Sequence, residues 1–226
     1  MTDPKDKTPT DQIIDAILSH VVFDGWSQTS FDAAVADTGI DPTVARGLFP
    51  RGARDVARAW HDRGDARMAK QMAEADLSDM RYSEKVAHAV KLRIMAIEDK
   101  EALRRATSQN ILPLNAPDGA KMLWQTADAV WTALGDTSED YNWYTKRATL
   151  SGVIGSTLLF WLGDNSPDNQ PTWDFLDRRI ENVMQFEKFK SKVTSGPLGR
   201  ALSAPGSLLN MIRAPRRRDD LPGQSR

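Results

Sequence analysis

Few residues in this sequence have a type and spacing that would support catalysis. The three histidines, His20, His61 and His88, fall on different predicted helices and show no metal-type spacing. Glu84 precedes His88 by four residues, whereas a carboxylate-bridged di-iron site requires Glu-x-x-His twice. The sequence contains no cysteine, no glycine-rich phosphate loop and no nucleophile elbow. We therefore predict a protein without a catalytic centre, metal or cofactor, while an enzyme site assembled from distant carboxylates stays open.

Charge is distributed unevenly along the 226 residues, although the net charge is -1. Residues 188–226 contain nine Lys and Arg against two Asp, a net charge of +7, which leaves 21 basic and 29 acidic residues, net -8, in residues 1–187. Such an asymmetry is typical of a tail that meets an anionic surface, or of a disordered solubilising tail. Residues 1–10 lack both an apolar signal core and the arginine-rich composition of a transit peptide, so we predict a cytoplasmic, bacterial protein.

The predicted fold class is all-α, because apolar residues recur at helical spacing and no segment alternates with period two for long enough to indicate a strand. The expected division is a disordered N-terminus at 1–9, a helix-turn-helix-like unit at 10–52, a C-terminal helical domain at 53–192 and an amphipathic basic tail at 193–226. After a helix expected at 82–97, we expect residues 98–109 to continue helically.

Three short helices between Thr10 and Pro50, with Gly39 between the second and third, predict a helix-turn-helix. Their order resembles the N-terminal domain of TetR-type repressors. DNA binding requires basic side chains that neutralise phosphates, but Asp11 to Pro50 contains one base, Arg46, against six aspartates. We therefore interpret this unit as a packing element and expect no nucleic-acid partner.

The stretch from Tyr141 to Asp164 predicts a helix, which we expect at the centre of the C-terminal region. Thr137 and Asp140 precede it in a capping-box pattern. Its part from Leu150 to Leu162 is apolar or small on every side, which predicts burial, and its 13 residues are too few for a membrane span of about 20. Small residues in this run indicate a close approach by another helix, or by an apolar ligand.

The tail carries two short apolar clusters with arginines beside them, interrupted by Pro205 and Gly206. A membrane surface would order such segments with the apolar side inward and the arginines toward anionic head groups. The alternative is a terminal helix docked on its own protein. The candidate membrane-binding residues are Leu198, Arg200, Leu202, Leu208, Leu209, Ile212 and Arg213.

Several motifs in order resemble one known family. They are DQIIDAILSHVVFDGW and LFPRG near the N-terminus, then WYTKRATLSGV, STLLFWLGDNSP and TWDFLDRRIENVM. Over residues 11–190 the chain resembles the ubiquinone-biosynthesis accessory proteins called COQ nine. The resemblance implies a TetR-like homodimer that is neither a regulator nor an enzyme. It also implies that the protein binds an isoprenoid lipid or ubiquinone intermediate and works with a di-iron hydroxylase acting on demethoxyubiquinone, peripherally at the inner face of the membrane.

The resemblance also suggests where these contacts lie. Trp143, Tyr144 and Arg147 match the surface patch of the family and are expected at the partner surface or cavity mouth. We assign large apolar residues of the predicted C-terminal helices to a lipid cavity within residues 53–192. They are Trp124, Trp131, Leu150, Ile154, Leu158, Phe175, Leu176 and Ile180. After Val153 the sequence IGSTLLFW replaces a tyrosine and a glutamate of many relatives, so a polar lipid contact there is not expected. The rival hypothesis is a ligand-responsive TetR-type transcription repressor.

Overall fold

The protein is helical throughout the part that the structure describes. A computed structural model describes residues 7–111 and 116–195. The helices in chain order are α1 (Pro9–Asp24), α2 (Gln28–Thr38), α3 (Pro42–Leu48), α4 (Ala53–Glu74), α5 (Tyr82–Met95), α6 (Lys100–Ile111), α7 (Ala116–Ala133), α8 (Tyr141–Gly163) and α9 (Gln170–Ser195), with a short 3-10 turn η2 (Pro167–Asn169) before α9. These ranges contain no strand, so the predicted all-α class is confirmed.

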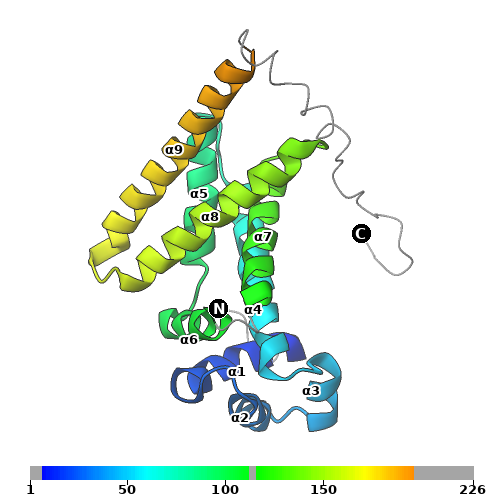
Figure 1. The fold of residues 1–226 in the computed structure, drawn as a ribbon. Coiled ribbons are helices and arrows are strands. Elements are labelled where there is room, and N and C mark those ends of the chain that lie inside the picture. Colours follow the sequence, from blue (N-terminus) through cyan, green and yellow to red (C-terminus); the bar gives the residue numbers. More distant parts are fainter. Residues whose placement is uncertain (1–6, 112–115, 196–226) are drawn as a thin grey trace.

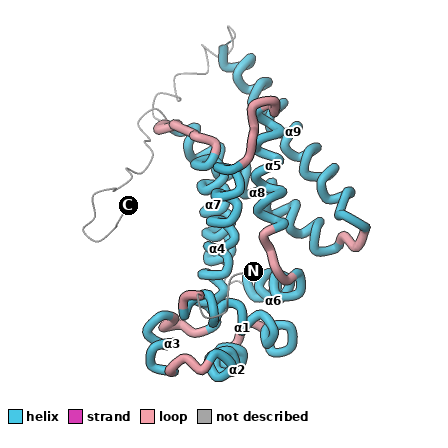
Figure 2. The backbone as a smooth tube through the Cα atoms, turned by 180° about the vertical axis from the view of Figure 1, so that it is seen from behind, coloured by secondary structure: helices cyan, strands magenta, loops and turns pink. Residues whose placement is uncertain are grey.

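Helices α1, α2 and α3 gather at one end of the molecule around the start of α4 (Figures 1 and 2). Each begins at a polar side chain that accepts a backbone N–H of the first turn, which is Thr8 for α1, Ser27 for α2 and Asp41 for α3. Their apolar faces, with Ile13 and Phe31 among them, form one buried cluster. The expected helix-turn-helix therefore has a core of its own.

Helix α4 leaves this unit and runs into the rest of the molecule, where α5, α7, α8 and α9 surround a second buried cluster (Figure 1). Helix α7 packs on α8 and on α4, while α9 packs on α5 and α8. The single long helix α4 thus contributes to both cores, with Val56 and Trp60 in the first and Met68 and Met72 in the second.

Residues 98–109 are expected to continue helically, and most of them lie in α6, but a break separates α5, which ends at Met95, from α6, which starts at Lys100. Side chains fix this break. The carboxylate of Asp99 accepts the backbone N–H of Ala102 at 2.7 Å, which starts α6. Glu98 turns toward α4 and accepts from Arg63 at 2.5 Å. The break directs α6 across the end of the bundle, beneath α8 (Figure 1).

Two expectations for α8 need correction. Asp140 itself is the N-cap, accepting the N–H of Asn142 at 2.9 Å, so Thr137 and Asp140 do not form a capping box. The apolar run is also not buried on every side, since Leu159 is 59% exposed and Phe160 is 40% exposed. Helices α7 and α9 contact α8 on part of its circumference, and the remaining face is open to solvent.

A buried ion pair joins α4 to α5. The guanidinium of Arg93 donates to the carboxylate of Asp65 at 2.5 Å, and both residues are buried. Gly64 provides the space for it, since a Cβ there would lie 2.8 Å from Cζ of Arg93. The glycine is therefore needed for close approach in the middle of a long helix.

Replacement of this glycine tests the packing. Gly64→Ala is expected to lower the free energy of unfolding by about 1–3 kcal/mol, because overpacking against Arg93 outweighs the roughly 1 kcal/mol that alanine adds to a helix. Gly47→Ala in α3 is the matched control, because a Cβ there would meet no atom within 4 Å. Urea unfolding followed by tryptophan fluorescence measures both variants. A Gly64→Ala protein as stable as the wild type would contradict the packing argument.

Candidate functional site

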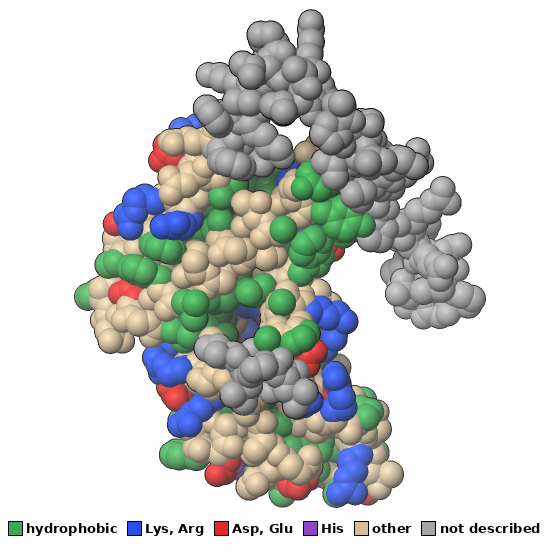
Figure 3. Space-filling model, viewed as in Figure 1, with side chains coloured by type: hydrophobic (Ala, Val, Ile, Leu, Met, Phe, Trp, Pro, Cys, Tyr) green, Lys and Arg blue, Asp and Glu red, His purple; other side chains and the backbone are tan. Residues whose placement is uncertain are grey.

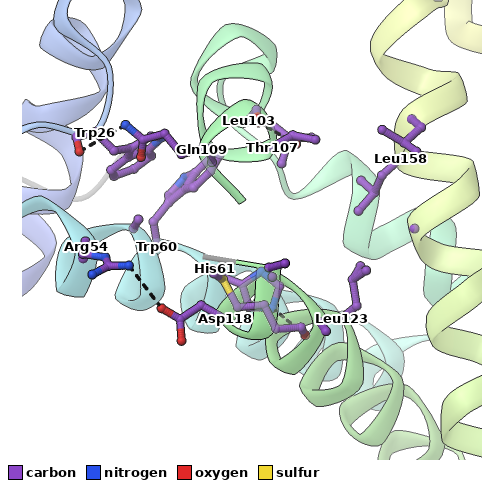
Figure 4. A pocket seen from close by; sticks show the side chains of 18 residues that line it. Trp26, Arg54, Trp60, His61, Leu103, Thr107, Gln109, Asp118, Leu123 and Leu158 are labelled. Carbon is purple, nitrogen blue, oxygen red and sulfur yellow. Dashed lines mark hydrogen bonds and ion pairs between the residues drawn. The ribbon is translucent and has the colours of Figure 1, made fainter. Parts of the chain in front are cut away.

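A cavity of about 400 Å³, called the main cavity below, lies where the N-terminal unit meets α4, α6, α7 and α8. Figure 3 shows a hollow there between apolar side chains, and Figure 4 shows the side chains that line it. Its size is within the range of roughly 300–1,000 Å³ that is usual for small-molecule sites. The wall is mostly apolar and aromatic, formed by Trp26, Ala57, Trp60, Leu103, Ala106, Ala120, Met122, Leu123, Gly155, Leu158 and Leu159 among others.

The hydrogen-bonding groups in this wall are largely engaged with the protein. The indole N–H of Trp26 donates to the carbonyl of Ala102 at 3.0 Å, and that of Trp60 donates to Glu98 at 3.2 Å. The hydroxyl of Thr107 donates to the carbonyl of Leu103 at 2.8 Å within α6. At the edge of the cavity the half-exposed side chains of Arg54 and Asp118 form an ion pair at 3.7 Å. With these polar groups satisfied, the interior is suited to hydrocarbon.

The close approach predicted for the small residues of α8 occurs at Gly155. A Cβ at this position would lie 3.1 Å from Cδ1 of Leu123, so α7 contacts the backbone of α8 there. The hydroxyl of Ser151 donates to the carbonyl of Arg147, four residues earlier, at 2.7 Å. Gly155 and Leu123 also line the cavity. The approach of another helix therefore occurs at Gly155, which also borders an apolar space, while the approach of an apolar ligand stays a prediction.

His61 is the most strongly perturbed titratable group in the cavity wall. Burial and the neighbouring charge of Arg93 lower its pKa to about 4. Its Nδ1 lies 3.1 Å from the Arg93 guanidinium, which can only donate, so Nδ1 accepts. Its Nε2 lies 3.1 Å from the carbonyl of Met122, which can only accept, so Nε2 carries the proton. The imidazole is therefore neutral in one defined tautomer.

The hydroxyl of Thr126 also belongs to the hydrogen-bond network around His61. Thr126 donates to Asp65 at 2.9 Å and lies 3.0 Å from Nε2 of His61. Helices α4, α5 and α7 are thus joined by buried hydrogen bonds immediately beside the cavity. Because both ring nitrogens are engaged, His61 acts as a structural histidine. In the ranges that the structure describes, no three His, Cys, Asp or Glu residues are grouped to hold a metal ion.

An aromatic cluster marks the start of α8. The ring of Trp143 lies 5.8 Å from Trp124 of α7 and 4.8 Å from Tyr144, and Arg147 lies 4.1 Å from its centroid. Trp143 and Tyr144 are half-buried, and their role at a partner surface or cavity mouth stays a prediction. The expected surface position of Arg147 is wrong, since this residue is 2% exposed.

The reason for the burial of Arg147 is its set of ionic partners. It donates to Asp128 at 2.6 Å and to Asp136 at 3.2 Å. Asp136 also accepts from Lys146 at 2.7 Å. Burial raises the pKa of Asp136, but hydrogen bonds from Lys146, Ser138 and Arg147 outweigh it and lower the pKa. Arg147 therefore positions the ring of Trp143 and does not itself reach the surface.

The structure does not bring the eight predicted cavity residues together. Leu158 lines the main cavity, and Ile154 lines a small space of about 40 Å³ next to it. Trp131, Leu150 and Ile180 border a separate cavity of about 210 Å³. Trp124 belongs to the aromatic cluster, and the remaining two residues line none of these spaces: Leu176 is in the core and Phe175 stacks on Phe160 at 4.7 Å.

Most of the wall of the main cavity was not predicted from the sequence, including Trp26, Trp60 and the alanines Ala57 and Ala106. One available signal was that Trp26 and Trp60 are the two tryptophans outside the run from Trp124 to Trp173. The membrane-binding residues predicted in the tail lie outside the described residues. None of the described helices is both long and apolar enough to cross a membrane.

Comparison with known proteins shows similarity to the COQ9 proteins. The COQ9 family model matches residues 116–187, which cover α7, α8 and part of α9. The ubiquinone biosynthesis protein COQ9, mitochondrial, of Rattus norvegicus is 31% identical over 192 residues, covering 81% of this chain and 61% of that protein. The Xenopus laevis protein COQ9-B, also mitochondrial, is 31% identical with coverages of 81% and 65%, and the human protein is 29% identical with coverages of 81% and 60%. The chain thus spans between 60% and 65% of the length of these relatives.

Among solved structures, a TetR transcriptional regulator from Nitrosomonas europaea is similar with a TM-score of 0.65 and 22% sequence identity. The similarity covers 79% of this chain and 99% of the regulator. It shows that the two proteins share a fold, and the predicted TetR-like architecture is confirmed.

The neutral state of His61 predicts a specific pH dependence. The unfolded chain takes up a proton near pH 6.5, whereas the folded chain resists protonation until about pH 4. The free energy of unfolding is therefore expected to fall as the pH is lowered between these values, by up to about 3 kcal/mol, with the full stability present above pH 6.5. Urea unfolding at pH 7, 5 and 4 measures this loss.

His61→Gln is the control, because glutamine keeps a polar side chain but does not titrate. Its stability is expected to depend less steeply on pH over the same interval. Equal pH dependence of the wild type and the variant would assign the acid sensitivity to other groups.

Proposed function

The chain is a homologue of the COQ9 proteins and carries their family domain at residues 116–187, and on this basis we propose that it is a non-catalytic, lipid-binding accessory protein of ubiquinone biosynthesis. In this proposal it takes up an isoprenoid quinone intermediate and presents it to a di-iron hydroxylase at a membrane. The names of these relatives assign them to ubiquinone biosynthesis. The lipid, the hydroxylase and the membrane contact are our inferences for this chain.

The observation that supports lipid binding is the apolar main cavity of about 400 Å³. A polyprenyl chain has no hydrogen-bonding groups, so it is held best where the wall also offers none unpaired. The engaged indoles of Trp26 and Trp60 and the hydroxyl of Thr107 meet that condition. We therefore place the isoprenoid chain in this cavity, with Leu158 and Leu159 at the side formed by α8.

The half-buried rings of Trp143 and Tyr144 support a partner contact at the start of α8. Large aromatic side chains held rigidly are the usual anchors of protein interfaces. Here the buried Arg147, fixed by Asp128 and Asp136, holds the ring of Trp143 in place. We propose that the hydroxylase binds this aromatic cluster.

An exposed face of α8 supports the proposed homodimer. Ala148, Gly152, Leu159 and Phe160 are exposed on it, and no atom lies within 4 Å of a Cβ built at Gly152. Small residues that alternate with large apolar ones allow helices to pack closely. A second copy of the chain on this face would cover Leu159, which is 59% exposed, and the exposed part of Phe160, whose ring also stacks on Phe175 of α9.

Membrane attachment in this proposal is peripheral and depends on the basic tail, whose predicted contact residues lie outside the described part. The expected bacterial, cytoplasmic location stays a prediction, since the curated relatives are named as mitochondrial proteins.

The alternative function, a TetR-type transcription repressor, is not favoured by the surface of α3. The N-terminal unit has the fold for it, but the exposed side chains of α3 include Val44, Leu48 and the single base Arg46. A helix with one cation is poorly equipped to neutralise the phosphates of a duplex.

Filling the main cavity tests the lipid site. Ala106→Trp places an indole in the space from the side of α6 and is expected to reduce the amount of co-purifying isoprenoid lipid at least fivefold. The measurement is native mass spectrometry of the protein purified from its own cells, with the released lipid identified after extraction. Ser108→Trp is the matched control, because Ser108 is an exposed residue of the same helix outside the cavity wall. A wild-type protein that carries no isoprenoid lipid would refute the proposal.

Removal of the central ring tests the partner surface. Trp143→Ala is expected to weaken binding of the di-iron hydroxylase at least tenfold, as truncation of an aromatic anchor commonly costs about 2 kcal/mol or more. Tyr141→Ala, at an exposed aromatic residue of the same helix, is the control. Surface plasmon resonance measures the affinity and calorimetry checks folding. Full affinity of the folded Trp143→Ala protein would place the hydroxylase elsewhere.

A further inference from the structure

A groove of about 520 Å³ lies between α4 and α7, and we call it the α4–α7 groove. None of its lining residues also lines the main cavity. Small side chains from both helices form much of its wall, and several of them are exposed to solvent. These are Ala66, Ala69 and Ala73 of α4 and Ala129 and Ala133 of α7. Because alanine projects little from a helix, a further segment of chain can approach both helices closely here.

The charged side chains that line the α4–α7 groove are all acidic, namely Asp62, Asp65 and Asp128. Buried arginines already bind two of them, since Arg93 donates to Asp65 at 2.5 Å and Arg147 donates to Asp128 at 2.6 Å. Asp62 has a looser ion pair, with Arg58 at 3.9 Å, and its side chain is 52% exposed. Asp62 is therefore accessible to a cation from outside the bundle.

One end of the groove is strongly acidic. Ala73 and Ala133 line this end, and a connecting segment follows each of them along the chain. Residues 74–80 contain three Asp and Glu and no Lys or Arg, and residues 134–141 have the same composition of charges. Asp76 and Asp79 are exposed. A segment that fits the groove should therefore combine apolar side chains with several positive charges at this end.

The chain itself contains such a segment beyond Ser195, in the part that the structure does not describe. Residues 196–226 contain six Arg and no Lys against two Asp, a net charge of +4. Within them, residues 207–218 read SLLNMIRAPRRR. Leu208, Leu209 and Ile212 would share one face of a helix, because residues four apart are neighbours on a helix surface. Four arginines follow this apolar cluster.

The direction of the helices brings the tail to the acidic end of the groove. Helices α4, α7 and α9 all run toward the top of Figure 1, so α9 ends at the same end of the molecule as α4 and α7. Residues 196–206 can extend about 36 Å, close to the roughly 39 Å length of α9 itself. This linker therefore lets residues 207–218 turn back along the bundle.

We propose that residues 207–218 dock in the α4–α7 groove of their own chain. Leu208, Leu209 and Ile212 pack against the alanines, and the four arginines lie at the acidic end. The same attachment buries apolar surface and brings opposite charges together, so it needs no partner molecule.

Docking of the tail would affect the aromatic cluster at the start of α8. Trp124 lines the groove and lies 5.8 Å from Trp143. A docked tail therefore lies beside the surface at which we place the hydroxylase. Under the proposed function, on which this consequence rests, the same tail attaches to the membrane. Membrane binding would then withdraw the tail and open the aromatic cluster.

The test uses the absence of cysteine from the full-length chain. A protein with Ala69→Cys and Ile212→Cys is expected to form an intramolecular disulfide in oxidised glutathione roughly fivefold faster than its control, because docking raises the effective concentration of the two thiols. The control carries Ser108→Cys and Ile212→Cys, since Ser108 is exposed on α6. Gels without reductant give the rates, peptide mass spectrometry locates the bond, and tryptophan fluorescence of the reduced proteins checks folding.

Charge removal tests the acidic end separately. Asp76→Asn with Asp79→Asn, added to the protein that carries cysteines at positions 69 and 212, is expected to slow disulfide formation roughly two- to fivefold at low salt. Asp174→Asn with Asp177→Asn is the matched control, because it removes the same charge from exposed residues of α9. This control is expected to react at the unmodified rate.

Vesicles test the competition with a membrane. Vesicles of equal parts phosphatidylcholine and phosphatidylglycerol are expected to slow disulfide formation, whereas vesicles of phosphatidylcholine alone are not. An unchanged rate with the anionic vesicles would overturn the withdrawal of the tail by membranes.

Two results would overturn the docking itself. Equal rates for the cysteine pairs 69–212 and 108–212 would show that the tail does not occupy the groove. Disulfides that join two molecules would assign the groove to the tail of a second copy. A protein that carries no isoprenoid lipid but forms the intramolecular disulfide would refute the proposed function and leave the docking in place.

Discussion

The buried ion pair between Asp65 and Arg93 is the interaction on which the rest of the structure depends. It fixes α4 against α5, and through Thr126 and His61 it extends to α7. Removing one member of such a pair leaves an unpaired charge in the interior and typically costs about 3–5 kcal/mol. Because α4 and α7 also contribute side chains to the wall of the main cavity, the ion pair supports two of the helices that form that wall. An apolar cavity stays open only if the surrounding helices are held rigidly, and here buried polar side chains hold them.

The two cavities differ in how far the protein satisfies its own hydrogen bonds. Around the main cavity, Trp26 and Trp60 each give their N–H to a protein oxygen, and His61 is engaged through both ring nitrogens. Beside the smaller cavity, the buried Nε1 of Trp131 has no hydrogen-bond partner among the described residues. The first arrangement suits a chain with no polar groups.

Local signals predicted the helices well, whereas contacts between distant residues were beyond the sequence. Pro42 after Asp41 located the start of α3, and the apolar spacing from Ile13 to Val21 located α1. The end of α5 was missed because it depends on Glu98 contacting α4, a tertiary interaction that no local pattern encodes. Arg147 was expected at the surface because arginine is usually exposed, but Asp128 and Asp136, on α7 and in the following loop, compensate its charge. The main cavity was missed for a similar reason, since its wall is drawn from five separate segments.

Helix α8 shows why a sequence that is apolar on every side need not be buried on every side. Gly155 and Leu158 face the main cavity, Leu150 and Val153 face the smaller one, and Leu159 and Phe160 are exposed. Each of these surroundings selects apolar residues, so periodicity cannot separate a core from a cavity wall or an open face. The small residues are informative in the same way. Gly155 lies against Leu123, whereas a Cβ built at Gly152 would meet no atom of the described residues within 4 Å. Gly155 therefore allows contact with α7, and Gly152 leaves a surface that a second helix can approach. The rest of the protein covers only part of the circumference of α8, so apolar surface of this helix stays available for binding. We propose that the lipid, the hydroxylase and the second subunit all contact α8.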